Sequence, residues 1–330
     1  MDSNVSKNTN SHKFFKVPLD RDRVILSVGN LLTQLLLSIL NLYEQKFGVS
    51  LEQFVTSVLK NKVMARLNNR PLSLEGDARA ILSDSKLVSI KYGCPIGLLL
   101  ASQEQTSPQV ISDRLRQLLS EGQKLRDRTK LRVYLEVLSS GWLNFYLDSE
   151  FIAYWLERSR LGIELNVRQS NKSIYHKPKP LSQTPVNLFQ IQYVHARCCS
   201  LLRLGAREKL ITLSNNQQDL GWQIEQPRLI PWLDRDNRLW LQGFAEYNLL
   251  HQLLTVTDCW DRREETNWTK IALGLSQATA IFQAECRFLG EIKVQTPKRA
   301  IARLGLIAIA RYWLHQILRE KLQVAAPTTL

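Results

Sequence analysis

Four long stretches after Pro185 carry apolar residues at the spacing that is typical of α-helices, and none alternates as a strand does. They cover residues 188–203, 244–256, 268–288 and 298–322. Helices with one apolar face bury it by packing against one another. The pattern predicts an all-α helical bundle over residues 185–330.

The preceding half of the chain mixes helices with strands. Short strands are predicted at 87–90, 131–137 and 143–147, among helices at 51–66, 96–104 and 110–119 and one from 151. Residues 159–184 then hold five basic residues against one acid, with two prolines. This composition is typical of a linker. We therefore expect an α+β domain at 20–158, a basic linker at 159–184 and the helical domain at 185–330.

Residues 24–43 contain no charged side chain, and 20 such residues are the length of a membrane-spanning helix. Polar residues nevertheless recur every three or four positions, at Ser27, Asn30, Gln34, Ser38 and Asn41. That spacing places them in one stripe on the helix. The stripe favours a packed amphipathic helix over a membrane span, so no membrane insertion is expected.

The chain carries 44 Lys and Arg against 30 Asp and Glu, a formal net charge of +14. Such an excess favours nucleic acid or another anionic partner.

The five cysteines form no Cys-x-x-Cys pair, and Cys198 and Cys199 are expected to fill a core. Residues 1–12 show no secretory pattern. These features predict a cytoplasmic protein with reduced thiols, no metal and no cofactor.

Two passages resemble arginyl-tRNA synthetase. Residues 187–203, NLFQIQYVHARCCSLLR, are similar to the family's run Val-Gln-Tyr-Ala-His-Ala-Arg-Ile-Cys-Ser-(Ile/Leu)-Leu-Arg, which opens the DALR-type anticodon-binding domain. Residues 286–291 are similar to Cys-Pro-Val-Leu-Gly, and residues 303–322 resemble the last helix of that domain. The resemblance implies that residues 185–330 form an anticodon-binding-like helical domain.

The second passage lies in the N-terminal half. Residues 92–101 with Ser107-Pro108 resemble Gly-Asp-Tyr-x-x-Asn-Val-Ala-Leu-x-Leu-Ala followed by (Asn/Ser)-Pro. Residues 141–151, GWLNFYLDSEF, are similar to Gly-Phe-Ile-Asn-Phe-x-Leu-Ser-x-Glu-Phe. Together they resemble the synthetase's N-terminal additional domain, an α+β module that touches the tRNA elbow.

The catalytic part of a class I synthetase has no counterpart in the sequence. Only 26 residues separate the two resembling regions, fewer than one βαβ unit of roughly 30 residues requires. No His-x-Gly-His or Lys-Met-Ser-Lys motif is present. The resemblance therefore implies a non-catalytic RNA-binding protein, most simply one that binds tRNA at the elbow and the anticodon. A protein-interaction or assembly factor on a retired synthetase scaffold is the alternative, and an enzyme of another type is a third option.

The candidate RNA-binding residues form three groups. Tyr193 and Arg197 are four residues apart and share a helix face with room for a base to stack, whereas His195 serves either RNA or helix packing. Trp142 and Asn144 correspond to an aromatic and an amide that the family places near a D-loop nucleotide, although Trp142 could instead pack on its own domain. The third group alternates as a strand would and could follow phosphates, or could be a solvated loop; it comprises Lys124, Arg126, Arg128, Lys130 and Arg132.

The connection 204–238 is longer than in the family and carries residues favoured at protein interfaces. They are Trp222, Trp232, Arg228, Arg235 and Arg238. Residues 279–286 have also lost most of the family's aromatic side chains, and the C-terminal tail differs. Two interpretations remain open: a partner-binding loop, or a long connection that packs its tryptophans against its own bundle.

Overall fold

A computed structural model describes residues 13–16, 27–48, 51, 68–71, 87–121, 132–170, 186–214, 222–260 and 266–329. The chain divides into two compact units. The first, here the sheet unit, comprises Met1–Leu19, Leu31–Asn68 and Lys91–Asp148. The second, here the helical unit, comprises Asp20–Asn30, Asn69–Ile90 and Ser149–Leu330. The mixed α+β character and the helical C-terminal region agree with the sequence prediction.

Strands β1, β4 and β5 and the second half of β3 belong to the sheet unit, and they are part of a five-stranded sheet with the order β1-β4-β5-β3-β2. Its strands are β1 (Lys13–Lys16), β2 (Asn68–Pro71), β3 (Leu87–Cys94), β4 (Arg132–Val137) and β5 (Leu143–Asp148). Strand β4 pairs antiparallel with both β1 and β5. Strands β4 and β5 lie where the sequence predicted them. Strand β3 extends four residues beyond the predicted 87–90, because Tyr92 and Cys94 continue its buried alternation.

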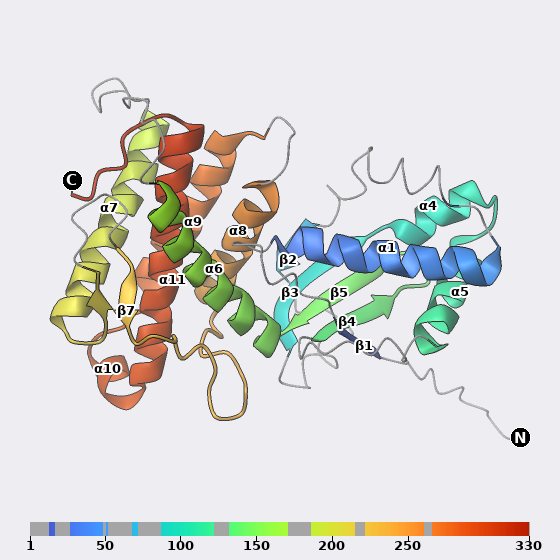
Figure 1. The fold of residues 1–330 in the computed structure, drawn as a ribbon, viewed down its shortest axis with the longest axis horizontal. Helices are drawn as coiled ribbons and strands as arrows, with labels where there is room; N and C mark the ends of the chain where they lie inside the picture. Colours follow the sequence, from blue (N-terminus) through green and yellow to red (C-terminus); the bar gives the residue numbers. More distant parts are fainter. Residues whose placement is uncertain are drawn as a thin grey trace, which may run out of the picture. The chain divides into compact units, whose positions relative to one another are not determined.

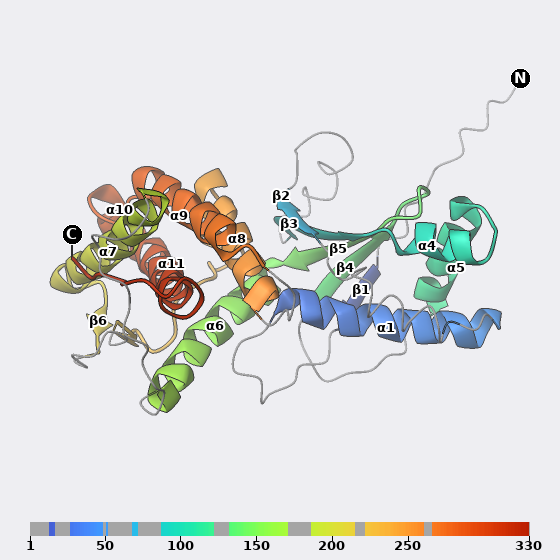
Figure 2. The same ribbon diagram turned by 90° about the horizontal axis from the view of Figure 1, so that it is seen from above.

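Helix α1 (Val28–Phe47) lies along one face of the sheet in Figures 1 and 2. Four members of the predicted polar stripe, at positions 30, 34, 38 and 41, are exposed, and most apolar positions between them are buried. Ser27 is buried instead, and its Oγ donates to Asp258 Oδ1 over 2.8 Å. Among the described helices, none is long and apolar enough to cross a membrane. Residues 52–66, predicted helical, lie outside the described residues.

Helices α4 (Ile96–Gln103) and α5 (Pro108–Glu121) complete the described part of the sheet unit, close to their predicted bounds. Gly97 donates its N–H to Gly141 O over 2.9 Å, which fixes the β4–β5 hairpin against the start of α4. A Cβ on Gly97 would lie 2.6 Å from Gly141 O, so the approach requires glycine. The contact holds Trp142, the next residue, in a defined position.

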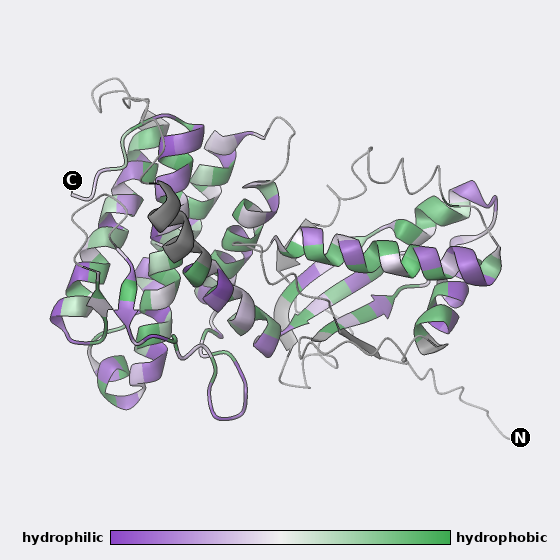
Figure 3. Ribbon diagram, in the orientation of Figure 1, coloured by the Kyte–Doolittle hydropathy of each residue, from purple (hydrophilic) through white to green (hydrophobic). Residues whose placement is uncertain are grey.

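The helical unit is a bundle that contains the four predicted helices. Its helices are α6 (Ser149–Ser170), α7 (Val186–Arg207), α8 (Phe244–Trp260), α9 (Trp268–Glu285), α10 (Glu291–Gln295), α11 (Pro297–Gln316) and the π-helical turn η4 (Ile317–Lys321). Two short antiparallel strands, β6 (Thr212–Leu213) and β7 (Ile224–Gln226), lie in the same unit. Figure 1 shows α7, α9 and α11 side by side, and α11 is buried over most of its length. Hydrophobic and hydrophilic residues are mixed along these helices in Figure 3, as expected where each has one buried face.

The expected linker differs from the structure over its first twelve residues. Helix α6 continues to Ser170, so residues 159–170 are helical, and the unit boundary falls at Ser149. Arg160 explains part of this difference, because its guanidinium is buried and donates to the carbonyl oxygens of Ile224 and Arg228. A basic residue that suggested a solvated linker therefore anchors a helix. The remaining positions 171–184 lie outside the described residues.

Candidate nucleic-acid interface

Helix α7 exposes two aromatic rings and a cation in one line. Phe189, Tyr193 and Arg197 are spaced four residues apart, and the two rings are 51% and 47% exposed. The opposite side of α7 is fully buried at Ile191, Cys198 and neighbouring positions. We call Phe189, Tyr193 and Arg197 the α7 stripe. Phe189 was not among the residues selected from the sequence, although its i, i+4 spacing to Tyr193 was visible there.

The sequence left two roles open for His195, RNA contact or helix packing, and the structure supports helix packing. The His195 side chain is completely buried, and its Nδ1 lies 2.8 Å from the carbonyl oxygen of Pro327. Burial, with Arg311 as a second cause, lowers the pKa of His195 to about 3. The ring is therefore neutral at pH 7 with Nδ1 donating, and it holds the C-terminal segment against α7. Gln192 makes a parallel contact, donating to Ala325 O over 2.8 Å.

We expect this burial to make the protein acid-sensitive. His315, whose ring centroid is 5.6 Å from that of His195, also has its pKa lowered by burial. An unfolded histidine titrates near pH 6.5, so below that pH the unfolded chain binds protons that the folded chain does not. The free energy of unfolding should fall from pH 6.5 downward, with each histidine adding up to about 1.4 kcal/mol per pH unit. Urea unfolding between pH 7 and pH 4.5 measures this slope.

His195→Gln should make that slope shallower. His251→Gln is the matched control, because His251 is only partly buried on α8. Equal slopes for the wild type and His195→Gln would show that the folded protein accommodates a protonated His195.

Trp142 and Asn144 follow the β4–β5 turn and occupy different environments. Trp142 is 38% exposed and lies over Gly93, where an added Cβ would meet its ring at 3.4 Å. Asn144 is buried, and its Nδ2 donates to Glu136 Oε2 over 3.1 Å. The structure does not support the expected contact of Asn144 with a D-loop nucleotide, because only 5% of the residue is exposed. Trp142 remains available for stacking.

The predicted basic strand is almost entirely outside the described residues. Lys124, Arg126, Arg128 and Lys130 are not described, and Arg132 is described only as the first residue of β4. Whether these cations share a face stays a prediction.

The tryptophans of the connection 204–238 pack against their own bundle. Trp232 is 4% exposed, its Nε1 donates to Glu157 Oε2 over 2.9 Å, and its ring touches α11 at Gly305. Trp222 lies under the guanidinium of Arg203, 4.6 Å from the ring centroid. The expectation that Trp232 anchors a partner is therefore wrong, and the packing alternative holds for it. Arg228, Arg235 and Arg238 are exposed.

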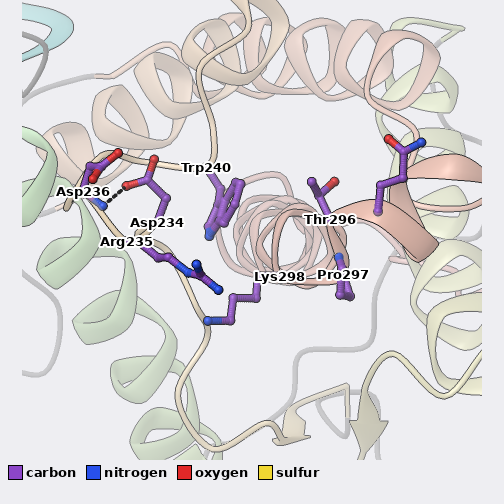
Figure 4. A pocket seen from close by; sticks show the side chains of 8 residues that line it. Asp234, Arg235, Asp236, Trp240, Thr296, Pro297 and Lys298 are labelled. Atoms are coloured by element: carbon purple, nitrogen blue, oxygen red, sulfur yellow. Dashed lines mark hydrogen bonds between the residues drawn. The ribbon is translucent and has the colours of Figure 1, made fainter.

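A cavity of about 420 Å³ lies beside the same connection. Its lining includes Asp234, Arg235 and Trp240 from the connection, and Thr296, Pro297 and Lys298 from the start of α11 (Figure 4). Only Arg235 of these residues was selected from the sequence. The sequence did offer one indication of Lys298: it directly follows a proline that can start a helix, and a cation in the first turn of a helix is electrostatically unfavourable.

The described residues contain no group of three or more His, Cys, Asp or Glu side chains that could hold a metal ion. The adjacent Cys198 and Cys199 are buried, as predicted for core residues. Burial raises the pKa of both thiols, which keeps them protonated and unreactive.

Comparisons with known proteins add no assignment to this geometry. No family model matches the chain, and neither a curated protein nor a solved structure matches it.

Proposed function

We propose that this protein binds structured RNA, with tRNA as the leading candidate, and that it does so as a non-catalytic relative of arginyl-tRNA synthetase. The α7 stripe is the observation that carries the proposal. Two large aromatic side chains are exposed one turn apart on α7, and a cation follows one turn later. Exposed apolar side chains that cluster in this way mark interaction sites. Unpaired bases stack on such rings while arginine neutralises a phosphate.

Two further features support this function. The chain has a net charge of +14, which favours a polyanionic partner. Trp142, in the sheet unit, presents a further exposed ring within the passage that resembles the elbow-binding module. The synthetase's two ATP-binding motifs are absent from the sequence, so we expect neither arginine-dependent ATP–pyrophosphate exchange nor tRNA charging.

Substitution of the stripe should weaken RNA binding. Tyr193→Ala and Phe189→Ala should each cost roughly 1–3 kcal/mol, the value of one base–aromatic stack. Phe244→Ala is the matched control, because Phe244 is a 74% exposed aromatic on α8 outside the stripe. Fluorescence anisotropy with a labelled tRNA transcript, repeated between 50 and 200 mM salt, measures both the loss and the salt slope that phosphate contacts require.

Two results would contradict the proposal. If Phe244→Ala weakened binding as much as Tyr193→Ala, or if affinity were independent of salt, the stripe would not be a specific RNA surface.

An assembly role is the second candidate function. Leu229, Phe244 and Val294 are 71%, 74% and 81% exposed, more than either aromatic ring of the stripe, and exposed apolar side chains favour protein contacts. Crosslinking mass spectrometry of the tagged protein in its host, with and without Phe244→Ser, tests this role. A crosslinked protein that is lost with Phe244→Ser while RNA binding persists would support it.

A further inference from the structure

Three hydrogen-bond donors converge on the cavity between residues 234–240 and the start of α11. Figure 4 shows the side chains of Arg235 and Lys298 pointing toward each other, with the indole of Trp240 beside them. The Trp240 Nε1 atom is buried and has no hydrogen-bond acceptor among the described residues. A buried donor without an acceptor is rare, because it forfeits its bond to water.

The two cations lie where electrostatics disfavours them. Within the described part of the chain, neither Arg235 nor Lys298 has an ion-pair partner, whereas Arg299 pairs with Glu246. Lys298 also lies in the first turn of α11, a helix of 20 residues whose N-terminus carries partial positive charge. Two like charges and a helix N-terminus that face one space together favour an anion there.

Two carboxylates, those of Asp234 and Asp236, also line the cavity, but neither is hydrogen-bonded or ion-paired to Arg235, Lys298 or the Trp240 indole. Asp234 Oδ1 accepts the backbone N–H groups of Asp236 and Arg238, at 2.8 and 2.9 Å, and so is engaged in forming the turn. In Figure 4 the carboxylates of Asp234 and Asp236 point away from Arg235 and Lys298. The donors therefore face the cavity without a protein acceptor between them.

The wall that carries these residues is held in place before any ligand arrives. Asp234 donates its backbone N–H to Arg238 O, and Trp240 donates to Trp232 O over 3.0 Å. Trp232 is in turn packed on α11 at Gly305, where an added Cβ would lie 2.7 Å from its ring. A preorganised wall lowers the entropy cost of binding.

We propose that this cavity binds the phosphate group of a nucleotide, with Arg235, Lys298 and the Trp240 indole N–H as donors. The volume of about 420 Å³ lies within the range of small-molecule sites and exceeds the need of a phosphate alone. The Trp240 and Pro297 rings offer apolar surface to the base. The nucleotide is either a free mononucleotide or one unit of an RNA strand. The site shares no residue with the α7 stripe, so it would bind a mononucleotide even if the stripe bound no RNA.

The Trp240 indole provides a direct readout. The protein has eight tryptophans, so ¹⁵N-tryptophan labelling gives at most eight indole N–H signals, and Trp240→Phe identifies the one from Trp240. We expect this signal to shift saturably on titration with AMP, GMP, CMP or UMP, or with a five-nucleotide RNA, and not with adenosine. Arg235→Gln and Lys298→Gln should each raise the dissociation constant about tenfold. Arg238→Gln, an exposed cation of the same turn outside the cavity lining, should leave it unchanged.

The arms of the experiment separate the ligand sources. A shift with mononucleotides assigns a free nucleotide, and a shift with the RNA alone assigns a unit of a strand. Inorganic phosphate acting as strongly as AMP would overturn the nucleotide assignment, and so would equal effects of Arg235→Gln and Arg238→Gln or the absence of any shift. Tyr193→Ala should not alter mononucleotide binding, so failure of the α7 stripe is recognised separately.

Discussion

Glu246→Ala is expected to lower the free energy of unfolding by about 3–5 kcal/mol, the usual effect of removing one partner of a buried ion pair. Glu246 is completely buried, and its Oε1 accepts from Arg303 Nε over 2.8 Å. Its Oε2 accepts the N–H of Gly243 over 2.6 Å at the start of α8. The alanine variant would leave the buried guanidinium of Arg303 without its counter-ion. Chemical denaturation monitored by far-ultraviolet circular dichroism measures the loss.

Two further variants test the explanation. Glu246→Leu combined with Arg303→Met should recover much of the stability, because replacing both buried charges by apolar groups removes their desolvation cost. Glu208→Ala is the matched control, since the side chains of the Glu208–Lys293 pair, 2.7 Å apart, are each more than a third exposed and the pair should contribute little. An effect of Glu246→Ala no larger than that of Glu208→Ala would show that the buried pair does not stabilise the fold.

Trp232→Ala is expected to destabilise the protein by about 3–5 kcal/mol, because it removes a large side chain from a close-packed site. The ring is 4% exposed and touches α11 at Gly305, and its Nε1 donates to Glu157 Oε2. Trp232→Phe should keep most of the buried area and lose the hydrogen bond to a carboxylate, at a cost of about 1.5–3 kcal/mol. Urea unfolding of both variants gives the comparison.

Arg238→Ala serves as the control for this pair, because its side chain is exposed in the same connection. The partner-loop interpretation makes the opposite prediction: Trp232→Ala would unfold like the wild type and lose only an interaction. That result would mean that the indole leaves its packed site in solution.

Periodicity was sufficient to locate most of the described elements. The polar stripe of α1 could be predicted because one residue in every three or four is polar along a single helix face. Four of its five members are exposed. Its fifth member, Ser27, is buried because it bonds to Asp258, a residue 231 positions away. The end of α6 was missed for a similar reason, since Arg160 is buried by carbonyl groups far along the chain.

In the candidate interface, too, some features followed from helical spacing and others depended on tertiary contacts. Spacing alone placed Tyr193 and Arg197 on one helix face, and both are exposed. Spacing also puts His195, two residues from each of them, on a different face of α7, but it could not show that the C-terminal segment and α11 bury that ring. The roles of Trp232 and Trp240 were equally hidden. The two side chains are identical and only eight residues apart, yet Trp232 packs at Gly305 and Trp240 faces a cavity.

Local sequence thus determined where most of the described helices and three of the strands lie, which helix faces are apolar, and that the whole carries a large positive charge. Those properties depend on residues within a few positions of one another or on composition. Tertiary structure decided which polar groups are buried, which cations lack a counter-ion, and that Lys298 meets Arg235 across a cavity. These depend on contacts between residues far apart in sequence, where the surroundings set the cost of each charge and donor.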